Sequence, residues 1–235
     1  ETLHGNEYQL FYKSAPRLPF GYRVVVDIFS DAIPDGAREG SNSQNILELS
    51  RIQKGLVLVC ASGEAQKRAA LNALTLALSR QKKTAILSRT KYPQFKTEKN
   101  VDDIVVPFNV YADFEVPNIP MFFDGTDPSP VEAVLLDFAQ NGIFDQVKDI
   151  LRSIKNGPVF LFMDAADIYD ALVQIDSAGH LKDFLRYDLL SAFAQVHPDF
   201  GMEHDPVHFV RMVSSDKRDA ILTSNPHEWS KILGA

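Results

Sequence analysis

Four short apolar runs most constrain what this chain can fold into. They cover residues 55–60, 84–87, 131–136 and 158–163. Helical patterns with apolar residues along one face follow the first run and the third, at residues 66–81 and 145–154. Apolar runs of this length are typical of strands buried on both faces of a parallel sheet, and intervening helices supply right-handed crossovers. The sequence therefore predicts an α/β fold in which helices flank a mostly parallel sheet.

The remaining segments extend this pattern at both ends. After the fourth run we predict helices at residues 168–178 and 181–196, a strand at 208–213 and short helices after residue 216. Asp167 precedes the first of these helices and is predicted to cap it. The proline-rich residues 99–130 predict only short extended pieces.

The first 44 residues show a different pattern. Apolar residues alternate from Tyr8 to Tyr12, and a run rich in β-branched residues extends from Tyr22 to Phe29, so both segments predict strands. Residues 31–43 combine proline, glycine and serine with charges, which is typical of a linker. We predict part of a small β-rich N-terminal lobe with its linker at residues 1–44, and the α/β core at residues 45–235.

Composition and charge exclude several classes of function. The 235 residues are 45% hydrophobic and 23% charged, as in soluble globular proteins. The net charge of −7 excludes a global basic field that would attract nucleic acid, and no apolar run approaches the roughly 18–20 residues that cross a bilayer. The single cysteine, Cys60, favours a reducing compartment, so we expect a cytoplasmic protein, or one peripheral to the inner face of a membrane complex.

The segment after the first apolar run lies where a phosphate-binding loop would lie. Such a loop reads G-x-x-x-x-G-K-[ST], because its amides surround phosphates, its lysine reaches the β and γ phosphates and its hydroxyl binds Mg²⁺. If Lys67 is the motif lysine, Ala61 and Gln66 replace the two glycines. Arg68 replaces the hydroxyl residue, and its guanidinium repels a divalent cation. Metal-dependent hydrolysis is therefore expected to be lost.

Two interpretations of this basic segment remain open from the residues alone. In the first, cations at the carboxyl ends of neighbouring strands hold an anion without a metal. This candidate nucleotide or anion site consists of Ser62, Gly63, Lys67, Arg68, Arg89 and Lys91. In the second, the same cations form ion pairs with Glu64 and Asp137.

Residues 55–74 resemble, without a gap, the strand, loop and helix of the motor ATPase superfamily of type IV pili and of type II and type IV secretion. The resemblance continues over most of the chain in pattern. Residues 133–137 are similar to the Walker B strand, with Asp137 as its carboxylate. The acidic box is replaced by Ser88, Arg89, Thr90 and Lys91, and both histidines of the histidine box are lost, to Pro158 and Ala165.

The resemblance implies a RecA-like P-loop core that is degenerate. Phosphoryl transfer depends almost wholly on positioning and electrostatics, so the combined loss of loop glycines, metal ligand, acidic box and histidine box predicts a pseudo-ATPase. No catalytic residue, metal or cofactor is then expected, and enzymatic activity is not favoured. If the chain is catalytic after all, Asp137 is the candidate carboxylate.

The function predicted from the sequence is that of an inactive assembly, scaffolding or regulatory component of a type IV pilus or secretion system. The alternatives are a motor with a rearranged loop that binds or hydrolyses ATP, and a sensor that binds a nucleotide or other anion without Mg²⁺. Protein subunits of the machine, including a true motor ATPase, or further copies of this chain are the expected partners. An aromatic group in the N-terminal lobe is a candidate contact surface, or else the core of that lobe: Phe11, Tyr12, Phe20 and Tyr22.

Overall fold

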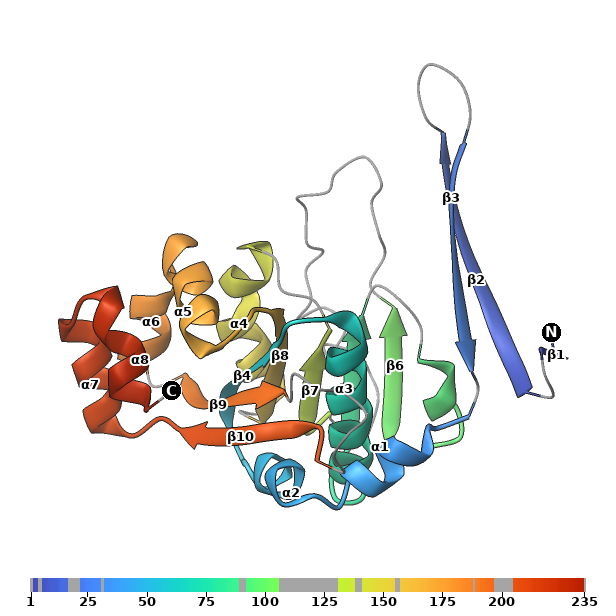
Figure 1. Cartoon of the computed structure of the whole chain (residues 1–235), viewed down its shortest axis with the longest axis horizontal. Helices are drawn as coiled ribbons and strands as arrows, with labels where there is room; N and C mark the ends of the chain where they lie inside the picture. The colour runs from blue at the N-terminus through green and yellow to red at the C-terminus, as the bar shows by residue number, and fades with distance from the viewer. Residues whose placement is uncertain are drawn as a thin grey trace.

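The computed structural model describes most of the chain. The described residues are 2–3, 6–16, 22–30, 32–88, 92–105, 131–137, 141–154, 157–187, 189–196 and 205–234. Their strands form one seven-stranded sheet and one three-stranded sheet, which share no strand. Figure 1 shows the larger sheet at the centre of the molecule, with helices packed on it and the smaller sheet to one side.

The seven-stranded sheet is mostly parallel, as the apolar runs predict. Its strands are β4 (Gly55–Ala61), β5 (Thr84–Ser88), β6 (Val101–Val105), β7 (Ala133–Leu136), β8 (Pro158–Asp164), β9 (Leu190–Val196) and β10 (Val207–Met212). The order across the sheet is β10-β9-β4-β8-β7-β5-β6, and only the pairing of β10 with β9 is antiparallel. β8 therefore lies between β4 and β7.

Helices cover both faces of this sheet (Figure 1). One face packs against α1 (Asp35–Gly40), α2 (Gln44–Ser50) and α3 (Glu64–Ser79). The other packs against α4 (Asn141–Ser153), α5 (Ile168–Ser177), α6 (Leu181–Arg186), α7 (Ser215–Thr223) and α8 (Trp229–Leu233). Short 3₁₀ helices span Pro93–Phe95 and Pro226–Glu228. None of the helices in the described ranges is long and apolar enough to cross a bilayer.

Strand β4 is buried on both sides, which explains why its sequence is apolar throughout. Successive side chains of a strand point to opposite faces. Leu56 and Leu58 accordingly join the core under α4 to α8, whereas Val57 and Val59 join the core under α1 to α3. All four side chains are at most 1% exposed.

The helix predicted at residues 181–196 is wrong. α6 ends at Arg186, and residues 190–196 form β9, which pairs with β4 on one side and β10 on the other. Leucine, alanine and glutamine favour helices locally. Here, ladders to two neighbouring strands and the burial of Leu190, Phe193 and Val196 outweigh that preference.

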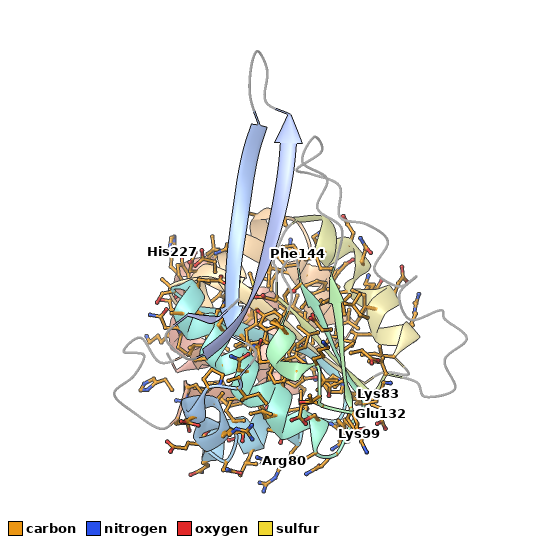
Figure 2. All side chains as sticks on the ribbon, turned by 90° about the vertical axis from the view of Figure 1, so that its right-hand side faces the viewer. Arg80, Lys83, Lys99, Glu132, Phe144 and His227 are labelled. Carbon is orange, nitrogen blue, oxygen red and sulfur yellow. The ribbon has the colours of Figure 1, made fainter. Side chains whose placement is uncertain are left out.

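The two strands predicted in the N-terminal segment are confirmed. β2 (Asn6–Pro16) and β3 (Tyr22–Ser30) form an antiparallel hairpin, with β1 (Thr2–Leu3) on the far side of β2. Figures 1 and 2 show this hairpin extending away from the α/β body. The predicted aromatic surface at Phe11, Tyr12, Phe20 and Tyr22 concerns side chains outside the described part of the structure, so it stays a prediction.

Helix α1 lies inside the segment that was predicted to be a linker. It spans Asp35–Gly40 and packs against α3. Ile33 and Ala37 are 9% and 5% exposed and belong to the core beneath α1 to α3. Two apolar side chains in a polar segment are too few to produce a helical pattern, which is why composition alone suggested a linker.

The thiol of Cys60 provides a test of how tightly β4 is packed. Cys60 is fully buried; burial, reinforced by Asp167 and Asp170, raises the pKa of its thiol to about 12. Because the thiolate is the reactive form, the native protein is expected to react with a thiol reagent at pH 8 about a thousandfold or more slowly than the chain in denaturant. Release of the reagent's chromophore measures both rates. Fast labelling of the native protein would mean that β4 opens locally.

Candidate functional site

The turn between β4 and α3 is shorter than the predicted phosphate-loop motif requires. β4 ends at Ala61 and α3 begins at Glu64, so only Ser62 and Gly63 connect them. A motif with its lysine at 67 would use residues 62–66 to surround a phosphate. Residues 64–66 instead form the first turn of α3, and the Lys67 amide already donates a helical hydrogen bond to the Gly63 carbonyl at 3.0 Å.

Side chains from this first turn crowd the turn between β4 and α3. The Gln66 side-chain oxygen lies 2.4 Å from the position that a Cβ at Gly63 would take. Glu64 places a carboxylate in the first turn of the helix, where the helix dipole favours negative charge. The Glu64 carboxylate therefore interacts favourably with the amino end of α3 and pairs with the cations of the same turn, Lys67 and Arg68.

Lys67 is held between two carboxylates. Its Nζ lies 2.8 Å from Glu64 Oε2 and 2.9 Å from Asp137 Oδ1. The Asp137 side chain, which follows β7, is only 4% exposed, and that of Lys67 is 16% exposed. Lys67 thus bridges from α3 to the end of a strand that is not adjacent to β4.

Arg68 completes this cluster of charges. Its Nε lies 2.9 Å from Glu64 Oε1, four residues back along α3. When all four side chains are ionised, the two cations and the two carboxylates of Glu64 and Asp137 sum to zero. The ion pairs proposed as the alternative to an anion site are therefore present for Lys67 and Arg68, and these described side chains carry no excess positive charge that would attract a polyphosphate.

Tyr92 is a member of this site that sequence reasoning missed. Its buried hydroxyl donates a hydrogen bond to Asp137 Oδ2. Its backbone N–H donates to Asp103 Oδ2 at 2.8 Å, and the Arg68 guanidinium carbon lies 6.0 Å from its ring centroid. The one signal in the sequence is that Tyr92 follows the strand predicted at residues 84–87, which is β5. Because β5, β7 and β4 run parallel, the residues that follow them lie at the same edge of the sheet.

The protonation states follow from burial and from these contacts. Burial raises the pKa of Asp137 above its ordinary value, although Lys67 and the Tyr92 hydroxyl oppose the shift. Burial alone would lower the pKa of Lys67, but the carboxylates of Asp137 and Glu64 outweigh it and raise that pKa. Burial, together with Asp137, also raises the pKa of Tyr92. Lys67 therefore stays charged and Tyr92 stays a donor at neutral pH.

The structure describes only some of the residues predicted for the anion site. Lys67, Arg68 and the fallback carboxylate Asp137 lie together, and exposed Ser62 lies with Gly63 on the turn before them. Arg89 and Lys91 lie outside the described residues, so whether they join the cluster stays a prediction.

The comparisons with known proteins point to a fold. No protein-family model matches the sequence, and no curated protein matches it. Among solved structures, the Legionella pneumophila ATPase DotB is 10% identical with a TM-score of 0.60, over 97% of this chain and 67% of that one. The Yersinia pseudotuberculosis ATPase DotB is also 10% identical, with a TM-score of 0.56 over 97% of this chain and 60% of that one.

The pilus retraction motor PilT with bound ADP is similar in the same way. It is 14% identical with a TM-score of 0.57, over 97% of this chain and 69% of that one. These likenesses confirm the predicted fold, a RecA-like α/β core with a mostly parallel sheet and flanking helices. At this level of identity the likeness concerns the fold, and functional residues must be judged from this chain's own geometry.

Proposed function

We propose that this chain is a catalytically inactive relative of the pilus and secretion motor ATPases, and that it acts through contacts with other proteins. The association with such machines is supported by the sequence resemblance and by the fold shared with PilT and DotB. The observation that carries the inactivity is the position of Lys67, whose ammonium is neutralised by Glu64 and Asp137. It would act as an assembly, scaffolding or regulatory subunit in the cytoplasm.

The chemistry of phosphoryl transfer supports this proposal. Catalysis of this reaction relies on cations and a metal that neutralise charge developing on the phosphoryl oxygens. Here the lysine is engaged within the protein, and Arg68 stands where the motif would place a metal-binding hydroxyl. The two-residue turn after β4 leaves little backbone to surround a phosphate. Neither ATP nor Mg²⁺ is therefore an expected ligand of this site.

The proposal is tested by nucleotide binding and turnover with Mg²⁺ on the purified chain. We expect no binding heat and no phosphate release above buffer, and no change in either quantity in Lys67→Ala or Arg68→Ala. Arg68→Ala preserves the contact between Lys67 and Asp137, so it keeps the test informative if Lys67→Ala folds poorly. Light scattering after size exclusion on the same samples reports whether the chain associates with itself.

The two alternative functions correspond to distinct results. Turnover that is abolished in Lys67→Ala and Asp137→Asn would show a motor with a rearranged loop and overturn the proposal. Nucleotide binding without turnover would show a sensor. Binding that disappears in Arg68→Ala would place the anion at the turn between β4 and α3.

A further inference from the structure

A hollow of about 700 Å³ lies at the amino end of β4, opposite the phosphate-loop position. Its walls come from the residue before β4, from α4 and from the segment between α6 and β9: Lys54, Lys148, Leu151, Arg152, Tyr187 and Leu189. A seven-residue strand is about 20 Å long. The hollow is therefore separate from the Lys67 cluster, and its role is independent of nucleotide binding.

The floor of the hollow is fixed by backbone contacts. The Leu56 amide donates to the Leu189 carbonyl at 2.6 Å, and Ser191 Oγ donates to the Lys54 carbonyl at 2.9 Å. Gly55 has φ of +91°, and a Cβ there would lie 2.8 Å from the Leu189 oxygen. Close approach of two chain segments thus forms the floor before any partner binds.

Three cations surround this floor. Lys148 Nζ lies 3.0 Å from Asp183 Oδ2, and Arg152 Nη1 lies 3.2 Å from Asp149 Oδ1. The Arg152 and Asp149 side chains are 77% and 60% exposed, and Lys54 is exposed as well. Exposed ion pairs contribute little to stability, so carboxylates from another molecule can replace these internal partners at low cost.

An exposed aromatic ring stands beside the cations. Tyr187 is 63% exposed; it and Met212, at 51%, are the two exposed large hydrophobic side chains in the described part of the chain. Lys148 Nζ lies 4.2 Å from its ring centroid. Tyrosine and arginine are the residues on which binding energy concentrates in protein interfaces. With Leu151 and Leu189 behind them, the walls combine apolar area with positive charge.

We propose that this hollow is a docking site for an acidic segment of a partner protein. Carboxylates of that segment would meet Lys54, Lys148 and Arg152, and an apolar side chain between them would contact Leu189 and Tyr187. Charge complementarity supports this occupant, because the three cations exceed the two carboxylates that pair with them, Asp149 and Asp183, and leave local positive charge on a chain whose net charge is −7. The cations lie on two separate segments, α4 and the residue before β4, which suits a chain of carboxylates better than one small anion.

The test uses fluorescence anisotropy with labelled peptides that alternate leucine or phenylalanine with aspartate and glutamate, at low salt. Matched peptides carry glutamine and asparagine in place of the acids. We expect the acidic peptides alone to bind, and the affinity to fall about tenfold in Arg152→Glu and in Lys54→Glu and about fivefold or more in Tyr187→Ala. Circular dichroism confirms that each variant is folded.

Lys99→Glu is the matched control. Lys99 is exposed and precedes β6. In the sheet, β6 is the fourth strand from β4, which puts about 19 Å between the amino ends of the two strands. Figure 2 shows Lys99 near Lys83 and Glu132. The substitution Lys99→Glu changes the net charge as much as Arg152→Glu does, and the affinity for the acidic peptides should stay unchanged. Absence of binding by every acidic peptide, or equal weakening in Lys99→Glu, would overturn the proposal. So would displacement of the peptide by inorganic phosphate at constant ionic strength, because the site would then bind small anions.

Discussion

Replacing Lys67 with alanine is expected to lower the free energy of unfolding by about 3–5 kcal/mol, the usual cost of removing one partner from a buried ion pair. The substitution leaves the Asp137 carboxylate, 4% exposed, with the Tyr92 hydroxyl as its remaining side-chain donor among the described residues. Urea unfolding measures the change. The single tryptophan, Trp229, is 4% exposed and reports the transition by fluorescence.

The pH dependence of this loss separates electrostatics from packing. Without Lys67, burial raises the pKa of Asp137 with less opposition, so folding favours its protonated form more strongly. A raised carboxyl pKa costs nothing below the ordinary value near 4, and the cost grows as the pH rises from there to the folded-state pKa. The deficit of Lys67→Ala should therefore be larger at pH 7 than near pH 4.

Two further variants serve as controls for this prediction. Lys99→Ala removes an exposed lysine and should change the free energy of unfolding by about 0.5 kcal/mol or less. The double variant Lys67→Met with Asp137→Leu removes both charges and should recover much of the loss, since it leaves no buried charge without a partner. An equal deficit at both pH values would attribute the effect to lost side-chain contacts instead.

The parts of the fold that the sequence predicted are those determined by local burial or local hydrogen bonds. β4, β5, β7 and β8 are recognisable because a strand covered on both faces must be apolar along its whole length. The cap at Asp167 was predictable for a similar reason, because a helix start needs a nearby acceptor, and its side chain accepts from the Asp170 amide at 2.8 Å.

The parts that sequence reasoning missed depend on contacts between distant segments. β9 has the composition of a helix and becomes a strand because β4 and β10 pair with it. The ion pair of Lys67 with Glu64 follows from helical spacing, whereas its pair with Asp137 depends on β8 lying between β4 and β7. Tyr92 reaches Asp137 across 45 residues of sequence, and no local pattern marks such a contact.

Gly55→Ala is expected to cost about 2–5 kcal/mol of unfolding free energy, because two penalties add at this position. The first is backbone strain, since φ is +91° and alanine disfavours that region. The second is steric, since the new Cβ would lie 2.8 Å from the Leu189 backbone oxygen and would also collide with the Ser191 hydroxyl. Relief requires β4 to separate from the segment before β9.

Gly179→Ala isolates the steric contribution to that prediction. Gly179 has φ of +83°, and a Cβ there would have no heavy atom within 4 Å, so its substitution should cost only the strain of about 1–2 kcal/mol. Urea unfolding of both variants gives the difference. Hydrogen exchange of the Leu56 amide, which donates to the Leu189 carbonyl, should accelerate in Gly55→Ala alone. Equal losses of unfolding free energy in the two variants would mean that β4 can shift away from Leu189 without cost. The floor of the hollow at the amino end of β4 would then be adaptable instead of preformed.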